Sequence, residues 1–190
     1  MKRALIVSKS EKAVAFFKSM LKEDRYEDVL CVPTGALARR TLSEQNLDLC
    51  IIDIPLKDEP GSELAIKAAE DSMCQVILTV KAEYFDEVTH QMEEYGIMTV
   101  SKPINRQMFY AALKMTDAIG IRMGRIQKEK EKLLQKIDDL RIVSRAKLTL
   151  ITNLGMSEND AHKYIERQAM DMRRTRRQVA ENILKTYQNR

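Results

Sequence analysis

Three side chains that could support phosphoryl chemistry lie at or next to the ends of short apolar runs. Asp53 ends the run LCIID, Thr79 lies at the end of the run QVILTV, and Lys102 follows GIMTV in the segment SKP. A carboxylate can attack phosphorus to form an aspartyl phosphate, while a hydroxyl and an ammonium hold the phosphoryl oxygens. This chemistry requires the three groups to meet, so it depends on the elements that position them.

The same three residues also have a purely structural interpretation. In that interpretation Asp53 begins a turn, Thr79 caps a helix and Lys102 is a solvated surface lysine. Carboxylates, hydroxyls and ammonium groups occur in these roles on many surfaces, so residue type and spacing leave both interpretations open.

The first hundred residues alternate between two patterns. Short apolar runs rich in Val and Ile lie at 3–7, 28–32, 49–53, 75–80 and 96–100. Helix-like stretches lie between them at 10–22, 34–45, 61–72 and 84–94. This alternation predicts an α/β fold, a flavodoxin-like doubly wound five-stranded parallel sheet. In such sheets the site lies at the carboxyl ends of the strands, where Asp53, Thr79 and Lys102 would converge.

A long helix is predicted after Pro103, because no proline occurs between about 104 and 151. Apolar residues recur on it in a heptad pattern, with Lys130 as the one exception: Ile119, Met123, Ile126, Leu133, Ile137 and Leu140. Charged residues occupy most other positions, which favours a coiled coil over residues 119–140 and a homodimer. The alternative is a long helix that packs on its own domain.

The last fifty residues, 141–190, are predicted to form a small all-α domain of three helices. Gly155 is a plausible helix stop, and Ser157 is a plausible N-cap for the next helix. This segment has 11 Lys and Arg against 5 Asp and Glu, a net charge of +6, while the preceding 140 residues have a net charge of −2. The asymmetry points to a polyanionic partner, with a solvated basic face as the alternative.

Composition excludes several other classes of protein. No apolar run is long enough to span a membrane or to serve as a signal peptide, so we expect a cytoplasmic protein with no membrane partner. The three cysteines are widely spaced and are expected to be reduced. Two histidines are too few for a His-rich metal site.

The first 118 residues resemble the receiver domain of two-component response regulators. The resemblance rests on CIIDIPLKDEPG, VILTVKA and SKP at their spacings, and on Gly61, eight residues after the acid. It implies that Asp53 is the phosphoacceptor, Thr79 the switch hydroxyl and Lys102 the phosphate-pairing lysine. It also implies a sensor histidine kinase as a partner.

Two departures from the receiver pattern stand out. Receivers carry a pair of acids after the first strand, which hold Mg²⁺, whereas this chain has Ser8 and Lys9. Mg²⁺ prefers hard oxygen ligands such as carboxylates, and these two positions supply none, so we expect no metal cofactor. Thr99 also stands where receivers usually have an aromatic residue. We therefore expect an atypical receiver that is phosphorylated weakly or not at all, with Lys9 and Lys102 clamping Asp53.

Residues 139–187 resemble the ANTAR domain, the RNA-binding module of AmiR- and NasR-type antitermination regulators. The resemblance rests on spaced matches that include Ala146-Lys147, GMSENDAHKYI, Ala169-Met170 and Val179-Ala180. Leu148, where many members have Gly, and Arg176, where an apolar residue is common, depart from it. The resemblance implies that a dimer binds a leader transcript with two hairpins and thereby prevents a terminator from forming.

The candidate RNA contacts are the small residue Ala146, which would allow close approach, and the basic residues around it. They are Arg145, Ala146, Lys147, Arg173, Arg174, Arg176 and Arg177. Cationic side chains suit RNA phosphates. The alternatives are a solvated basic face for the cluster and ordinary helix packing for Ala146.

Three other functions are compatible with parts of the sequence. A DNA-binding response regulator would share the receiver and the dimer, but no helix-turn-helix pattern is clear. An enzyme that uses Asp53 ranks low, since no histidine lies near the motif and no Gly-rich phosphate loop is present; we expect no catalysis. A protein-interaction adaptor, in which the coiled coil recruits a partner, is the remaining alternative.

Overall fold

A computed structural model describes residues 2–24, 26–71 and 74–188 of the chain. The chain divides into two compact units, the first ending at Arg125 and the second beginning at Ile126. The strands are β1 (Lys2–Val7), β2 (Tyr26–Val32), β3 (Leu49–Asp53), β4 (Gln75–Lys81) and β5 (Met98–Lys102). The helices are α1 (Glu11–Glu23), α2 (Gly35–Glu44), α3 (Ser62–Asp71), the 3₁₀ turn η1 (Ala82–Tyr84), α4 (Phe85–Glu93), α5 (Arg106–Leu154), α6 (Glu158–Asp171) and α7 (Arg176–Gln188).

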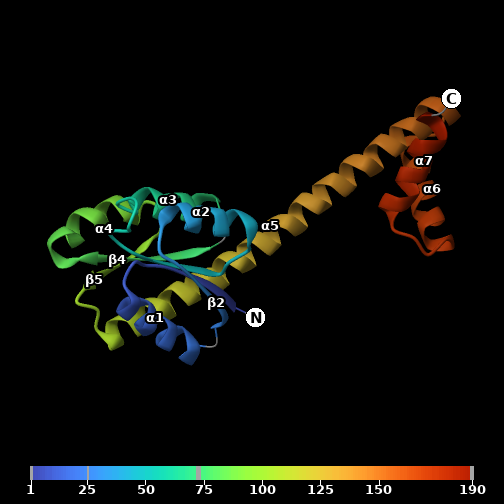
Figure 1. Cartoon of the computed structure of the whole chain (residues 1–190). Helices are drawn as coiled ribbons and strands as arrows, with labels where there is room; N and C mark the ends of the chain where they lie inside the picture. The colour runs from blue at the N-terminus through green and yellow to red at the C-terminus, as the bar shows by residue number, and fades with distance from the viewer. Residues whose placement is uncertain (1, 25, 72–73, 189–190) are drawn as a thin grey trace. The chain divides into compact units, whose positions relative to one another are not determined.

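The first unit is a parallel five-stranded sheet with helices on both faces. Its strand order is β2-β1-β3-β4-β5, and every neighbouring pair is parallel. Helices α2, α3 and α4 cover one face, and α1 and the first part of α5 cover the other (Figure 1). The predicted fold class is confirmed. The strand order reverses between β1 and β3, and the crevice at their carboxyl ends is where such sheets bind ligands.

Burial on both faces explains why these strands are apolar runs without alternation. All five residues of β3 are buried, and its side chains divide between two cores. Cys50 and Ile52 pack with α2 and α3, while Leu49 and Ile51 pack with Phe17 of α1 and the start of α5. Each large apolar side chain buried in this way contributes about 1.5–3 kcal/mol.

Two predicted strand ends are shifted in the structure. The last strand spans Met98–Lys102 rather than 96–100, because Gly96, at a φ of 68°, completes the turn after α4. Lys102 is therefore the last residue of β5 and does not follow it. Strand β4 continues to Lys81, so Thr79 lies two residues before its end, directly opposite Asp53 in the ladder.

Helix α5 is a single element of 49 residues that contributes to both units. It begins in the receiver-like core with Phe109 and Leu113 and ends in the small C-terminal core with Ala146 and Leu150. The predicted seam residues from Ile119 to Leu140 lie in between, and within the single chain the apolar ones are exposed. A second chain that covers this stripe remains a prediction.

The C-terminal unit packs the last part of α5 against α6 and α7. Its core consists of Ala146, Leu150, Ala161, Ile165, Ala169, Val179 and Ala180. Gly155 adopts a φ of 65°, which a glycine reaches without strain, and ends the helix as predicted. Ser157 is the N-cap of α6, where its hydroxyl accepts a hydrogen bond from the Asp160 backbone N–H at 3.1 Å. The three-helix arrangement is confirmed.

Candidate functional site

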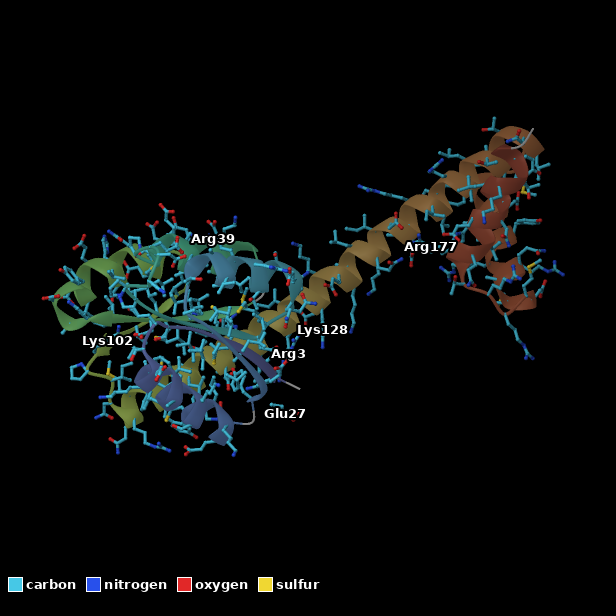
Figure 2. The ribbon with its side chains drawn as sticks, in the orientation of Figure 1. Arg3, Glu27, Arg39, Lys102, Lys128 and Arg177 are labelled. Atoms are coloured by element: carbon cyan, nitrogen blue, oxygen red, sulfur yellow. The ribbon has the colours of Figure 1, made fainter. Side chains whose placement is uncertain are left out.

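Asp53 lies at the end of β3, and both of its carboxylate oxygens are held by other side chains. Oδ1 accepts from the Thr79 hydroxyl at 2.9 Å and lies 2.5 Å from the Lys102 ammonium. Oδ2 accepts from the Ser8 hydroxyl at 2.6 Å. Asp53 is only 6% exposed. The carboxylate, hydroxyl and ammonium expected from the sequence therefore do converge, and Figure 2 labels Lys102 at the end of β5.

Ser8 replaces an acid with a neutral hydrogen-bond donor. It follows β1 at the reversal of strand order, is buried, and its backbone N–H bonds to the Val32 carbonyl at 3.1 Å. Its hydroxyl oxygen accepts from the Ser10 backbone N–H at 3.0 Å, so its hydrogen is available for Asp53. A hydroxyl that donates to a carboxylate stabilises the charged form without adding a second negative charge.

Lys9 does not clamp Asp53, which corrects the expectation drawn from the sequence. Among the described residues its ammonium donates instead to the Leu56 carbonyl at 3.4 Å. The Lys102 ammonium, besides pairing with Asp53, donates to the Ile54 carbonyl at 2.6 Å. Ser8 and Lys9 are consecutive, so their side chains project in different directions and only one of them reaches the acid. Both lysines thus hold carbonyls of the loop that follows Asp53.

Sequence reasoning missed a second anchor of that loop. The Asp58 carboxylate accepts from the backbone N–H groups of Gly35 at 2.8 Å and Ala36 at 3.0 Å, at the start of α2. These N–H groups lower the pKa of the Asp58 carboxyl. Glu59 forms an ion pair with Arg39 at 2.7 Å. The signal in the sequence was the acidic turn KDEPG, which supplies carboxylates but does not say which helix they cap.

The residues around Asp53 do not fit Mg²⁺. Mg²⁺ is bound through carboxylates, and here Asp53 is the acid at the strand ends, while Ser8 and Lys9 take the other two positions. In the part of the chain that the structure describes, no three His, Cys, Asp or Glu residues gather as metal ligands would.

Thr99, at the position where the receiver pattern usually has an aromatic residue, shares a hydrogen bond with Thr89 at 2.7 Å.

Ala146 is not an RNA contact in this fold. It is completely buried in the core of the C-terminal unit, because it lies on the stripe of α5 that packs against α6 and α7. Its small size permits close packing between helices and not close approach of RNA. The helix-packing interpretation of Ala146 is therefore the one that the structure supports.

Three of the predicted basic contacts are already ion-paired within the C-terminal unit. Lys147 pairs with Glu158 at 2.9 Å, and Arg176 pairs with Glu166 at 2.7 Å. Arg177, labelled in Figure 2, pairs with three acids: Asp138 at 2.6 Å, Asp139 at 2.8 Å and Glu181 at 2.9 Å. These ion pairs link α5, α6 and α7.

Two of these acids have lowered pKa values. Arg177 lowers the pKa of Asp139, and Lys147 lowers the pKa of Glu158, because an adjacent cation favours the ionised carboxylate. Both acids are ionised at neutral pH, as carboxyl groups of ordinary pKa also are, and they compete with any other anion for these two cations.

The other three predicted basic contacts are not engaged in this way. Arg145, Arg173 and Arg174 form no ion pair with any residue that the structure describes, and all three are exposed. Arg173 ends the turn after α6 with a φ of 51°. The seven predicted contacts thus divide into one buried residue, three ion-paired cations and three available cations.

None of the helices in the described part of the chain combines the length and apolarity that a bilayer crossing requires.

Comparison with protein families identifies two domains in the chain. The model of the response regulator receiver domain matches residues 4–114, which is more than half of the chain, and that of the ANTAR domain matches residues 131–184. The Asp53 site lies within the first match and the basic residues within the second.

Two curated proteins have sequences similar to that of this chain. The transcriptional regulatory protein PdtaR of Mycobacterium tuberculosis is 26% identical over 185 residues, covering 97% of this chain and 90% of its own length. The aliphatic amidase regulator of Pseudomonas aeruginosa is 26% identical over 94 residues, covering 50% of this chain and 47% of its own.

Solved structures share the fold of the first unit. The receiver domain of an HD domain-containing protein from Pseudomonas fluorescens Pf-5 aligns with a TM-score of 0.58 at 18% identity, over 65% of this chain and 92% of that one. A CheY-like receiver domain from Methanospirillum hungatei JF-1 aligns with a TM-score of 0.56 at 21% identity, over 65% and 98%.

Proposed function

The chain belongs to the response regulators that join a receiver domain to an ANTAR domain, and on this premise we propose that it is a transcription antiterminator. In this proposal the C-terminal unit binds a leader RNA that carries two hairpins, and binding prevents a terminator from forming. The carrying observation is a small basic domain, net +6 over residues 141–190, in which Arg145, Arg173 and Arg174 are exposed and pair with no acid among the described residues. Cations of this kind bind RNA phosphates.

The active form in this proposal is a homodimer. The apolar residues Ile119, Met123, Ile126, Leu133, Ile137 and Leu140 are all exposed on α5, and they recur with the heptad spacing of a coiled coil. A second α5 would cover this stripe, and the two ANTAR domains of the dimer would each take one hairpin. Lys130 within the seam would weaken the pairing and help to set its register.

The receiver domain, in our proposal, senses its input without efficient phosphorylation of Asp53. A phosphoacceptor carboxylate must leave its hydrogen-bond partners to attack phosphorus, and here Ser8, Thr79 and Lys102 hold both oxygens. The transferred phosphoryl group also needs its charge neutralised, and the chain lacks the acids that would hold a divalent cation. A sensor kinase would then act on this domain by docking, with weak phosphoryl transfer or none.

Binding of the full chain to a two-hairpin leader RNA, followed by fluorescence anisotropy, tests the RNA proposal. We expect tight binding to the two-hairpin RNA and weaker binding to either hairpin alone, since one dimer would engage both. A duplex DNA competitor should displace the RNA poorly. Displacement by DNA at similar concentrations would favour the DNA-binding alternative, and no binding to either nucleic acid would favour a protein-interaction adaptor.

Intact-mass spectrometry after incubation with acetyl phosphate and Mg²⁺ tests the receiver proposal. We expect little or no phosphorylated chain. Stoichiometric modification that disappears in Asp53→Asn would overturn it.

A further inference from the structure

Three hollows of the C-terminal unit differ in the charges that line them. One of about 510 Å³ includes Asp139 and the ion-paired Lys147, Arg176 and Arg177. Another, of about 400 Å³, includes Glu166 together with Arg174. The third, of about 260 Å³, is lined by Arg145, Leu148, Thr149, Asn153, Leu184 and Tyr187. This third hollow, which we call the α5–α7 groove, has a cation in its wall and no acid among the described residues that line it.

The cation of the α5–α7 groove is available to a ligand. Arg145 forms no ion pair with any described residue, in contrast to Lys147, which lies two positions further along α5 and pairs with Glu158. A step of two residues turns a helix by about 200°. Arg145 and Lys147 therefore flank opposite sides of the stripe that α5 buries, and the acids cluster on the Lys147 side.

The polar side chains of the groove are oriented by hydrogen bonds to the backbone of α5, and they keep donors and acceptors that could bind a ligand. The Thr149 hydroxyl donates to the Arg145 carbonyl at 3.0 Å, and the Asn153 side-chain amide donates to the Thr149 carbonyl at 2.8 Å. This contact orients the Asn153 amide along the helix. Its oxygen has no donor among the described residues, and its second amide hydrogen is also unused.

The apolar wall of the groove exposes a large side chain. Leu148 is 62% exposed. Leu184 and Tyr187 of α7 also line the groove, and Tyr187 packs on the core of the unit, which restrains its ring. The groove therefore combines an aromatic ring, an exposed leucine, an oriented amide and an unpaired guanidinium.

We propose that the α5–α7 groove binds one unstacked nucleotide of an RNA loop, a proposal that rests on the RNA-binding function proposed above. Tyr187 and Leu148 hold the base between them. The Asn153 oxygen accepts a hydrogen bond from an exocyclic amino group of the base, and Arg145 pairs with the adjoining phosphate. RNA loops present bases that can be splayed out and stacked on aromatic side chains, whereas paired bases of a duplex are not accessible in this way.

The amide sets a chemical preference for the base. Adenine, cytosine and guanine carry an exocyclic amino group that can donate to the Asn153 oxygen, and uracil does not. An amide that both accepts and donates matches the edge of adenine best. Among the described residues, the lining of the groove has a cation and no acid, which favours an anionic occupant, whereas Asp139 and Glu166 line the other two hollows.

A set of variants in the full chain tests the groove, with the anisotropy of a labelled two-hairpin RNA as the readout. Arg145→Ala removes the phosphate contact, Asn153→Ala the amide, and Tyr187→Leu the ring while keeping apolar bulk for the core. We expect each to weaken binding by about fivefold to a hundredfold, as loss of a base contact does. Lys163→Ala, which removes an exposed cation of α6 outside the groove, is the charge-matched control and should change the affinity least.

A base scan identifies the nucleotide. Each loop base is replaced in turn by an abasic residue, and binding is measured with the wild-type chain and with Asn153→Ala. At one loop position the abasic change should weaken the wild-type complex, and it should cost less in Asn153→Ala, where the hydrogen bond to the base is already lost and only the stacking is left to remove. Uridine at that position should weaken the wild-type complex by less than the abasic residue does, because it keeps the stacking and loses only the hydrogen bond, and it should add little to the loss in Asn153→Ala.

The outcomes separate this inference from the proposed function. Wild-type RNA binding that none of the three groove variants alters would overturn the groove and leave the antiterminator proposal intact. Absence of RNA binding by the wild-type chain would overturn both. A change of oligomeric state in Leu148→Ser on sedimentation, with unaltered affinity per dimer, would assign the groove wall to the interface with a second copy and would also overturn the inference.

Discussion

The two domains pair opposite charges in different surroundings. In the receiver domain, Asp53 is buried and is held by Ser8, Thr79 and Lys102. In the ANTAR domain the ion pairs of Lys147, Arg176 and Arg177 lie at the surface. A buried charge must be satisfied from within the fold, and removal of its partner is costly, whereas exposed pairs contribute about 0–1 kcal/mol and exchange readily with solvent ions.

This difference assigns different roles to the two sets of charges. The network around Asp53 fixes one arrangement of the strand ends, because a buried carboxylate that loses a partner is left unsatisfied. In the proposed function, RNA phosphates bind the unpaired cations of the ANTAR domain first and can replace an internal carboxylate at the ion-paired ones. The network around Asp53 thus serves stability, whereas the surface cations of the ANTAR domain serve anion binding in this proposal.

Lys102→Ala should produce the largest effect. This change leaves the Asp53 carboxylate buried beside two neutral hydroxyls. We expect the free energy of unfolding of the receiver domain to fall by about 2–3 kcal/mol. The loss is smaller than for a fully buried pair because the Lys102 side chain is partly exposed. Urea unfolding measures the loss. Lys9→Ala is the matched control and should cost about 0.5 kcal/mol or less, since Lys9 makes only a long contact with a carbonyl. Equal losses in the two variants would contradict the assignment of the ion pair to Lys102.

Ser8→Ala should produce the next largest loss. It removes the donor to Asp53 Oδ2 and should destabilise the domain by about 1–2 kcal/mol, the cost of leaving a buried acceptor unsatisfied. In Asp53→Asn the same serine change should cost less, because the neutral amide needs the hydroxyl less. The double-mutant cycle therefore reports the coupling directly. Additive losses would show that Ser8 stabilises the domain independently of Asp53.

RNA binding should separate the available cations from the ion-paired ones. Arg174→Ala should reduce the slope of log affinity against log salt by about one unit, as loss of one phosphate contact does. Lys147→Ala should reduce it by less, because Glu158 already neutralises this lysine. Titrations at several salt concentrations measure both slopes. A larger reduction for Lys147→Ala would mean that RNA displaces Glu158 and that the ion-paired face is the main contact.

The smallest predicted effect is a pH dependence of ANTAR domain stability. Arg177 lowers the pKa of Asp139 in the folded state, so this pair stabilises the domain above the unfolded pKa of Asp139, which is 3.8. The contribution disappears as the pH falls through the folded value. Unfolding followed between about pH 5 and pH 3 should show a steeper loss for wild type than for Arg177→Ala. Identical profiles would mean that the pair is absent in solution. Arg174→Ala, which has no ion pair to lose, should follow wild type.

The fold was predictable from the sequence, because buried parallel strands require continuous apolar runs such as LCIID and QVILTV. Convergence of Asp53, Thr79 and Lys102 followed from the fold, since the carboxyl ends of parallel strands meet at one edge of the sheet. Lys102 was expected to follow the last strand, whereas it is the last residue of β5, because the stretch GIMTV gives no sign that Gly96 and Ile97 precede the strand.

Other features depended on directions that residue types do not specify. The sequence supplies Ser8 and Lys9 side by side, and only the geometry at the end of β1 decides which of them faces Asp53. Ala146 and Lys147 likewise are adjacent in a motif, but one faces the core and the other the surface. The acids that neutralise Lys147, Arg176 and Arg177 come from other turns and helices, so a count of charges overstates the cations available to RNA.

A reconstructed metal site gives the account a positive control. Ser8→Asp combined with Lys9→Asp would place three carboxylates at the strand ends, the ligands that Mg²⁺ prefers. We expect added Mg²⁺ to raise the melting temperature of this variant and not that of the wild-type chain, since a ligand that binds the folded state stabilises it. A similar rise in the wild-type chain would show that its own residues hold the ion.

The affinity of the full chain for two-hairpin RNA, measured with and without beryllofluoride and Mg²⁺, tests the central claim most directly. The claim is that the Asp53 network is complete within the chain, while the ANTAR domain remains free to bind RNA. It predicts the same dissociation constant under both conditions. A tenfold or larger change that requires both beryllofluoride and Mg²⁺, and that is lost in Asp53→Asn, would show instead that Asp53 is a working phosphoryl switch.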